Sequence, residues 1–321
     1  MPTFGAHMSV AGGLHHALEA AMNLDCDCLQ IFTKSPNQWG SKDLTDSEVR
    51  QFKTVWATCE KPGPLIAHDA YLTNLGSPDP ELWNKSIEAF AVQIRRAKKL
   101  GLAYLVMHPG AHMGSGEVAG VSRVTRGLDL AMEAAETESL NILLETTAGQ
   151  GTTLGWRLEH LRDILASSVH SKNLGICLDT CHVHAAGYAL DSADSAANLL
   201  DSIDNLIGLQ RLHVIHVNDS KKPAGSRADR HEHLGKGTLS VTALGALLSD
   251  PRLAQKAMIL ETPKEDEDGQ PMDPVNLKIL RLLASGKDIT HHEEDPTRRT
   301  RSGGAHRSPT SKRRQSNKRY N

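Results

Sequence analysis

Six apolar, strand-like runs in this chain each end on a side chain that can bind a metal ion. The residues at these ends are His68, His108, Glu145, Asp179, His216 and Glu261. In a parallel β/α barrel the interiors of the strands pack in the core, and the carboxyl ends of the strands carry the chemistry. The repetition therefore predicts one ring of metal ligands that many strands supply to one end of a barrel.

Strand-like and helix-like segments alternate along roughly the first 285 residues. We expect strands at 3–7, 28–33, 64–68, 103–108, 141–145, 174–179, 212–217 and 257–261. Between them lie amphipathic segments such as 81–99 and 122–138, where apolar residues recur at helical spacing. Eight such pairs match the size of a (β/α)8 TIM barrel of the α/β class. In the alternative, an open doubly wound sheet, the ligands would gather at one crevice.

The composition changes near residue 286. Nine Lys and Arg and no Asp or Glu lie from Pro296 to Asn321, whereas the rest of the chain has 27 Lys and Arg against 38 Asp and Glu. An acidic body suits a protein that holds several divalent cations. The polar segment after the barrel cannot bury enough surface to offset its ordering entropy. We therefore expect a metal-binding barrel domain at 1–286 and a disordered basic tail at 287–321, which adds affinity for nucleic acid, directs localisation or is inert.

The cysteines and the amino terminus bear on the cellular compartment. The five cysteines are odd in number and lie mostly in apolar runs, which predicts buried free thiols in a reducing environment. We find no signal-peptide pattern and no apolar run long enough to cross a membrane. We expect a cytoplasmic, nucleoid-associated protein in a bacterium, with the nucleus as the alternative in a eukaryote.

Three further residues extend the ring to nine candidate ligands. His182 follows the sixth strand in the sequence DTCH, and Asp229 and His231 share a loop that contains glycines. A single histidine at a strand end is more often a satisfied polar residue, but buried carboxylates are costly unless they are paired or bind metal. Mixed Asp, Glu and His ligands suit zinc or manganese, and nine of them can hold two or three ions.

The order of the motifs resembles the endonuclease IV family of abasic-site DNA endonucleases. The likeness extends from about Thr3 to Ala284, and its motifs are GAHMSVAGG (5–13), FTK…QW (32–39), HDAYLTNLG (68–76), HPGAH (108–112), LETTAGQG (144–151), DTCH.HAAGY (179–188), HVNDS (216–220), DRHEHLGKG (229–237) and LET (260–262). The family implies a (β/α)8 barrel with three zinc ions, Mn²⁺ being an alternative at one site. By position, the ligand sets are His68, His108 and Glu145; then Glu145, Asp179, His216 and Glu261; and finally His182, Asp229 and His231.

The resemblance also implies an activity in base excision repair. The family hydrolyses the phosphodiester 5′ to an abasic site, which leaves a 3′-hydroxyl and a 5′-deoxyribose phosphate, and it removes phosphate or sugar fragments from blocked 3′ ends. Glu145, as the bridge between two ions, and Glu261, which orients the attacking water, are the implied catalytic residues. The implied partner is double-stranded DNA with abasic sites or blocked 3′ ends, bound by a monomer.

Loop residues beside the ring are candidates for DNA contacts. Tyr71 and Leu72 are apolar side chains that can fill a gap in the base stack, although packing within their loop is an equal alternative. Asn37, Gln38 and Trp39, which follow the second strand, are candidates to assist at this gap. The candidates for contacts with DNA phosphates are Lys34, Arg227, Arg230 and Lys236. For these basic residues a purely solvated role is equally open.

The chain departs from the family pattern at three positions. Asn37 stands where the best-known member has an arginine that enters the DNA stack, His184 replaces an aromatic residue and Ala189 replaces an aspartate. None of the three is a candidate ligand. Three rivals are weighed. The first is a metal-dependent sugar isomerase on the same barrel, which uses fewer ions and mainly carboxylates. The others are a DNA-damage-binding module without catalysis and a structural nucleic-acid protein that acts through its tail.

Overall fold

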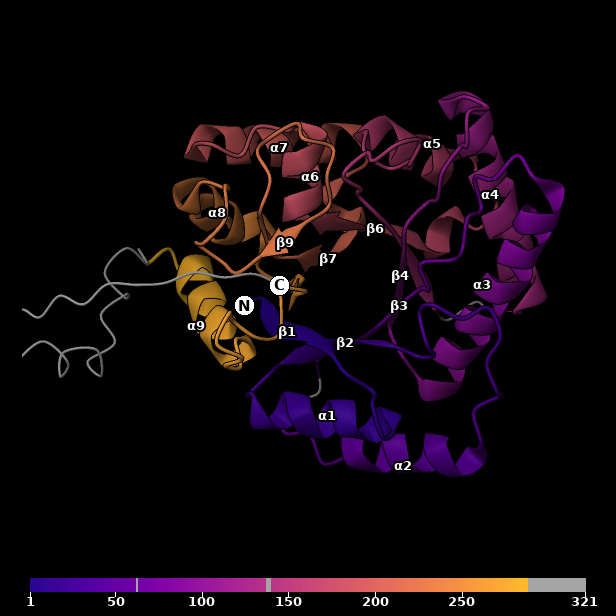
Figure 1. Cartoon of the computed structure of the whole chain (residues 1–321), viewed down its shortest axis with the longest axis horizontal. Helices are drawn as coiled ribbons and strands as arrows, with labels where there is room; N and C mark the ends of the chain where they lie inside the picture. The colour runs from indigo at the N-terminus through magenta and orange to yellow at the C-terminus, as the bar shows by residue number, and fades with distance from the viewer. Residues whose placement is uncertain (62, 137–139, 288–321) are drawn as a thin grey trace, which may run out of the picture. The chain divides into compact units, whose positions relative to one another are not determined.

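Eight parallel strands close into a barrel in the computed structural model, which describes residues 1–61, 63–136 and 140–287 (Figure 1). Around the ring they follow the order β1-β10-β7-β6-β5-β4-β3-β2. Their bounds are β1 Thr3–Met8, β2 Cys28–Phe32, β3 Leu65–His68, β4 Tyr104–Met107, β5 Asn141–Glu145, β6 Leu174–Asp179, β7 Leu212–His216 and β10 Ala257–Leu260. The predicted TIM barrel is confirmed, and each predicted strand end lies within one residue of the observed end.

Helices surround the barrel (Figure 1). They are α1 Leu14–Asn23, α2 Asp46–Trp56, α3 Pro80–Leu100, α4 Glu117–Ala134, α5 Leu158–Ser167, α6 Thr180–Ala186, α7 Ala193–Leu206, α8 Val241–Leu248 and α9 Asp273–Ala284. The helix expected at 81–99 is confirmed as α3, which Asp79 caps by accepting from two backbone N–H groups. The helix expected at 122–138 begins earlier, at Glu117, because Gly120 and the exposed Val118 obscure the apolar spacing of its first turns.

The inside of the barrel is apolar. Every barrel strand except β1 contributes to one buried cluster, which is formed by Cys28, Ile66, Val106, Leu143, Cys177, Val214, Ala257 and Ile259. Every residue of β3, β6 and β10 is buried, as expected for strands covered on both faces. All five cysteines are free thiols, and four of them are buried, which confirms the prediction from their number and setting.

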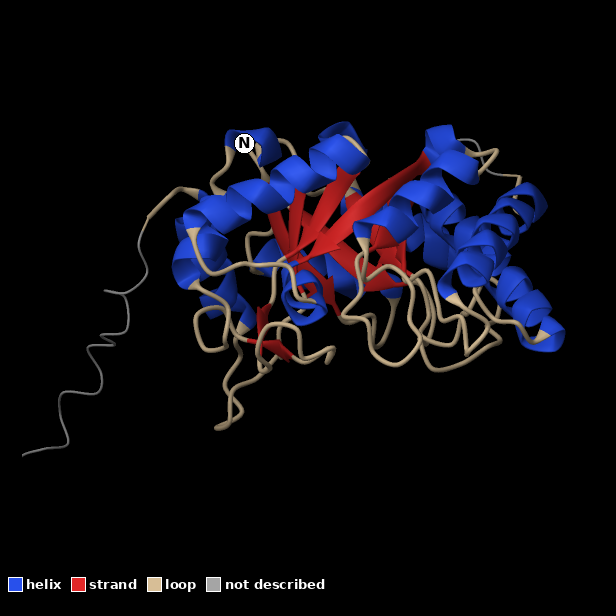
Figure 2. Cartoon of the chain, turned by 90° about the horizontal axis from the view of Figure 1, so that it is seen from above, coloured by secondary structure: helices blue, strands red, loops and turns tan. Residues whose placement is uncertain are grey.

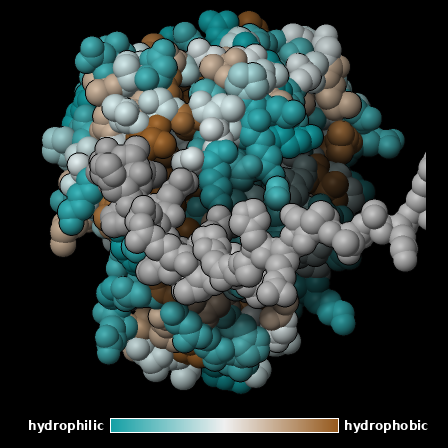
Figure 3. Space-filling model, turned by 60° about the vertical axis from the view of Figure 1, so that its left-hand side comes forward, coloured by the Kyte–Doolittle hydropathy of each residue, from teal (hydrophilic) through white to brown (hydrophobic). Residues whose placement is uncertain are grey.

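The long loops gather along one edge of the barrel, which is the lower edge in Figure 2. Among them, β8 (Asp219–Ser220) pairs antiparallel with β9 (His231–Glu232), so the segment that carries His231 is a short ribbon rather than the plain loop expected. The surface visible in Figure 3 is mainly polar, with hydrophobic residues in small separate groups. None of the described helices is both long enough and apolar enough to span a bilayer.

The first compact unit of the chain is Met1–Asp288. The basic tail predicted at 287–321 lies outside the described residues, apart from Lys287. The barrel domain boundary at 286 and the disorder of the tail therefore stay predictions.

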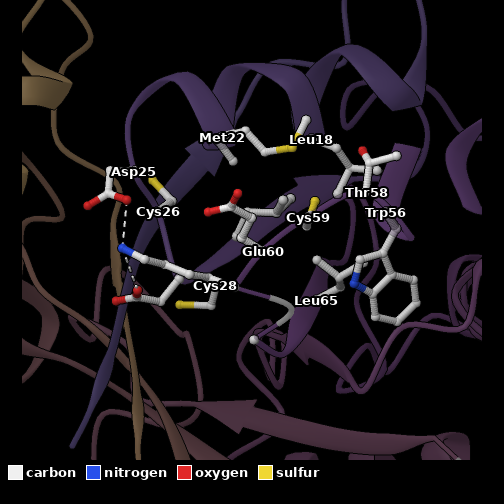
Figure 4. A pocket seen from close by; sticks show the side chains of 15 residues that line it. Leu18, Met22, Asp25, Cys26, Cys28, Trp56, Thr58, Cys59, Glu60 and Leu65 are labelled. Carbon is white, nitrogen blue, oxygen red and sulfur yellow. Dashed lines mark hydrogen bonds and ion pairs between the residues drawn. The ribbon is translucent and has the colours of Figure 1, made fainter. Parts of the chain in front are cut away.

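A cavity of about 280 Å³ lies before the first residues of β2 and β3 (Figure 4). Cys26, Cys28 and Trp56 line it, and Lys61 Nζ lies 2.6 Å from Asp25 Oδ1 at its edge. The amino ends of barrel strands usually serve stability rather than chemistry. This cavity is therefore at the wrong end of the strands to belong to the predicted ligand ring.

Candidate metal centre

All nine candidate ligands meet at the carboxyl ends of the strands. Their ligand atoms form three groups, and within each group all atoms lie within 4.8 Å of one another: His68, His108 and Glu145; Glu145, Asp179, His216 and Glu261; and His182, Asp229 and His231. These are the three sets that the family resemblance implied. Two other groupings exist among the described residues, one on the surface of α1 and one that joins Cys181 to Asp179 and His231.

The first group is built on Glu145, the last residue of β5. Its Oε2 lies 3.0 Å from His68 Nε2 and 3.1 Å from His108 Nε2. His68 ends β3, and His108 follows β4 directly. The Nδ1 atom of His68 lies 2.8 Å from the carbonyl oxygen of Asp69, to which it can donate. Such a bond leaves Nε2 without a proton and aims its lone pair at Glu145, as in many metal sites.

The second group centres on His216, the last residue of β7. Its Nδ1 lies 3.1 Å from both Glu145 Oε1 and Glu261 Oε2, and 3.9 Å from Asp179 Oδ2. Asp179 and His216 are opposite each other in the register of β6 and β7, so the strand pairing itself brings these two side chains together. Glu145 contributes one oxygen to each of the first two groups, which is the arrangement of a bridging carboxylate.

No barrel strand carries a residue of the third group: His182 lies on α6, Asp229 in a loop and His231 in β9. Asp229 Oδ2 lies 3.1 Å from His182 Nε2, and Asp229 Oδ1 lies 3.2 Å from His231 Nε2. Both Nε2 atoms are buried, yet neither has a partner in hydrogen-bond geometry. Their Nδ1 atoms lie 2.8 Å from Thr146 O and 3.1 Å from Glu261 O, respectively. In the neutral imidazoles, donation from Nδ1 leaves both Nε2 atoms unprotonated beside a carboxylate, a donor set that fits a metal ion.

The charges of the site favour cations. Burial alone would raise the pKa of Glu145, but His108 and His216 outweigh it and hold this pKa well below its usual range. Burial also works to lower the pKa of His182, but the neighbouring Asp179 and Asp229 raise it well above its usual range. Four carboxylates converge with five histidines. With neutral imidazoles these carboxylates carry a charge of −4, which bound divalent ions can neutralise.

Comparison with known proteins identifies the family. The profile of the xylose isomerase-like TIM barrels matches residues 18–283. A probable endonuclease 4 of Geotalea daltonii is 45% identical over 277 residues, which are 86% of this chain and 96% of the relative. The crystal structure of endonuclease IV from Thermus thermophilus superposes with a TM-score of 0.78 at 36% identity, covering 88% of this chain and 99% of that one. The chain belongs to the endonuclease IV family.

It is thus a nuclease-type hydrolase of that family. The barrel itself is shared more widely: a D-tagatose 3-epimerase-like protein superposes with a TM-score of 0.67, covering 88% of this chain and 97% of that one. Because the identity there is only 21%, this likeness shows the fold alone.

Three polar residues contact the candidate ligands of this chain, and two of them, Gln30 and Asn218, were not predicted from the sequence. Gln30 Nε2 donates to Glu261 Oε1 over 2.6 Å, and Gln30 Oε1 lies 2.8 Å from His216 Nε2. Asn218 Nδ2 donates to Asp179 Oδ2 over 2.7 Å. A fully buried glutamine in the middle of the apolar run CLQIF was the available signal. The third is His7, whose Nδ1 lies 3.2 Å from Glu261 Oε1.

The candidate DNA contacts are placed beside the three groups. Tyr71 is 63% exposed, and its ring packs edge-on against Phe32 with centroids 5.5 Å apart. Leu72 is half-buried, whereas Asn37, Gln38 and Arg230 are exposed. Tyr71 therefore stays largely exposed to solvent while its ring contacts Phe32.

Two basic candidates are engaged within the protein. The Lys34 ammonium is buried and donates to the carbonyl oxygens of Gln38 and Trp39, so it shapes its own loop. The Arg227 guanidinium stacks 3.6 Å from the ring centroid of Trp156. Neither side chain is freely available for a phosphate.

The three departures from the family pattern lie in different settings. Asn37 and Ala189 are both exposed. His184 is buried, and its Nε2 lies 3.1 Å from Thr238 Oγ1. All three positions are outside the three groups of ligand atoms.

Proposed function

We propose that this protein is a DNA-repair endonuclease that hydrolyses the phosphodiester on the 5′ side of an abasic site. The observation that carries the proposal is the convergence of nine Asp, Glu and His side chains into three adjacent groups. The family membership supports the same reading, because relatives of this length are named endonucleases. The products would be a 3′-hydroxyl and a 5′-deoxyribose phosphate, and blocked 3′ ends would be substrates of the same site.

We further propose that the three groups hold three zinc ions, with Mn²⁺ as an alternative at one group. When bound, zinc lowers the pKa of water and offsets negative charge on a phosphate ester. Three divalent ions would turn the charge of −4 on the carboxylates into +2, and a phosphodiester carries −1. The donor atoms available, imidazole nitrogens and carboxylate oxygens, are those that zinc accepts.

In this proposal Glu261 orients the attacking water. Burial works to raise the pKa of Glu261, but His216 holds it well below its usual range, so the carboxylate is ionised at neutral pH. Gln30 fixes one carboxylate oxygen by donating to Oε1, while Oε2 faces His216. An ionised, oriented carboxylate can accept a hydrogen bond from a nucleophilic water. Glu145, fully buried and shared between two groups, would keep those groups at a fixed separation.

Recognition would use the loops that surround the groups. An abasic nucleotide costs less to swing out of the duplex than a paired one, because its pairing is already lost. A cavity of about 250 Å³ beside the third group, lined by Asn74, Gln150 and Thr153 among others, offers room for a sugar without its base. Tyr71 and Leu72 would enter the gap left in the base stack, and Asn37, Gln38 and Arg230 would contact the backbone.

A sugar isomerase is the second candidate, because epimerase-like proteins share the fold. One group of carboxylates and histidines would be enough for that chemistry. The third group, with Asp229 and His231 supplied from outside the barrel strands, is superfluous for it and favours the nuclease.

The deciding experiment uses a duplex with one tetrahydrofuran abasic analogue and a matched intact duplex. We expect incision on the 5′ side of the analogue only, leaving a 3′-hydroxyl, and loss of incision when a chelator is added. Elemental analysis of the purified protein distinguishes zinc from manganese. Failure of the metal-replete protein to cut the abasic duplex would overturn the proposal.

A further inference from the structure

One buried carboxylate near the site belongs to none of the three ligand groups. Asp219 is the first residue of β8 and is 1% exposed. Four backbone N–H groups donate to it: Ser220 N over 2.7 Å and Leu239 N over 3.0 Å to Oδ1, and Gly235 N and Gly237 N over 3.0 Å each to Oδ2. Hydrogen bonds to an ionised acceptor are among the stronger ones in proteins, and losing a partner of a buried group is costly.

Three of the four donors belong to one segment, 235–239, which follows β9. That segment follows Asp229 and His231, the two candidate ligands on the loop between β8 and α8. The ribbon pairing places Ser220 opposite His231, and Thr238 N returns to Ser220 O over 2.8 Å. The Asp219 carboxylate therefore links β8 to segment 235–239, which follows the loop that carries Asp229 and His231. We call these hydrogen bonds the Asp219 clamp.

The loop sequence is matched to this carboxylate. A Cβ atom at Gly237 would lie 2.3 Å from Asp219 Oδ1 and 2.5 Å from Ser220 O, distances that real Cβ atoms do not show. Gly235 has φ 78°, a conformation that favours glycine. Only a chain with small residues here can wrap its N–H groups around a buried carboxylate in this way.

The other two groups are anchored differently. Glu145, Asp179 and His216 are the last residues of barrel strands, whose ladders hold them in register. Asp229 and His231 have no such ladder, apart from the two-residue ribbon. Besides the Asp219 clamp, Asn276 accepts from Leu234 N over 3.1 Å, and Gln150 Oε1 accepts from Asp229 N over 2.7 Å.

We propose that Asp219 is a positioning residue for the third group. Its carboxylate gathers the amides of 235–239 and thereby keeps Asp229 and His231 beside His182. This inference rests on the proposed function, because it assigns Asp219 to the retention of one of the proposed three ions. It predicts that the third ion depends on Asp219, whereas the two ions held by strand ends do not.

The test compares Asp219→Asn with Gly237→Ala, which perturbs the same clamp from the loop side. The matched control is Asp250→Asn, because the Asp250 carboxylate also accepts from a backbone N–H group, that of Arg252, but lies before the amino end of β10. Zinc per chain is measured after dialysis against graded concentrations of a competing chelator. Hydrogen exchange of the peptide 229–239 is measured in parallel on metal-free and zinc-loaded protein.

We expect both clamp variants to bind the weakest-held ion at least about tenfold less tightly, the low end for residues that orient ligands. The other two ions stay bound, and Asp250→Asn keeps all three. Exchange in 229–239 accelerates in the clamp variants with and without zinc, since the amides lose their acceptor.

Two results would overturn the inference: unchanged retention of three ions in both clamp variants, or loss of all ions together from variants with native circular dichroism. If Asp219→Asn does not fold, Gly237→Ala decides alone. A wild-type protein with fewer than three ions would contradict the proposed trinuclear site. In that case, exchange in 229–239 still shows whether Asp219 holds the loop.

Discussion

The ligand ring has two kinds of support. Glu145, Asp179 and His216 end barrel strands and are fully buried, and the strand register sets their spacing. Asp229 and His231 lie on an excursion between β8 and α8, are half-buried, and owe their positions to side-chain acceptors. The contrast indicates that the ends of barrel strands can supply most of a cluster of side chains able to bind metal ions. The last group has to be completed by a folded loop with its own anchors.

The largest expected effects come from removing one acidic candidate ligand at a strand end and one in the loop. We expect Glu145→Gln to lower incision of abasic DNA by more than about 100-fold, beyond the range seen for residues that only orient ligands. It should also release two ions, since its oxygens face His68, His108 and His216.

Asp229→Asn should release one ion and leave the first two groups filled. Zinc content and initial incision rates of both variants measure the difference, with Glu88→Gln, an exposed position on α3, as a control. Equal ion loss from the two variants would contradict the distinction between ladder and loop.

Glu261→Gln separates the rate of incision from the affinity for DNA. We expect incision to fall by about 10²–10³-fold, the cost typical of removing one oriented catalytic group. Affinity for the abasic duplex should change little, because Glu261 faces His216 and Gln30 rather than the loops of the rim. Single-turnover incision and fluorescence anisotropy measure the two quantities separately. Normal cleavage by this variant would refute the assigned role.

Tyr71 tests whether the loops recognise the lesion. Its 63% exposed ring should stack in the abasic gap, so Tyr71→Ala is expected to weaken binding by about 1–3 kcal/mol, or roughly 5- to 150-fold. Zinc content should be unchanged. Val118→Ala, also highly exposed but on α4, provides the control. Equal affinity for abasic and intact duplex in the wild type would remove the basis of this prediction.

Deletion of 287–321 is expected to have the smallest effect. The nine Lys and Arg of 296–321 make DNA binding more salt-dependent if they contact phosphates, so deletion should flatten the slope of log K against log salt. Metal content and incision of the abasic duplex at low salt should stay as in the full chain. An unchanged slope would assign the segment to a role other than DNA binding.

Much of the fold was readable because its signals are local. The run LGICLD is apolar throughout and ends on a charge, and β6 spans those six residues. The run AMIL before Glu261 is also apolar throughout, and β10 spans those four residues. The start of α4 was misplaced because an exposed valine and a glycine weaken the helical spacing that the prediction relied on.

The sequence by itself determined which residue types end the strands and named all nine candidate ligands, and the family motifs then divided these nine into three sets. Spacing could not show that Gln30 joins His216 to Glu261, because residues 186 and 231 positions apart meet only when the barrel closes. Nor could it show that Asp219 collects the amides of a loop that begins 16 positions later. Strand ends are local properties of the chain. The contacts that hold the candidate ligands depend instead on which distant groups the closed barrel brings close to a buried carboxylate.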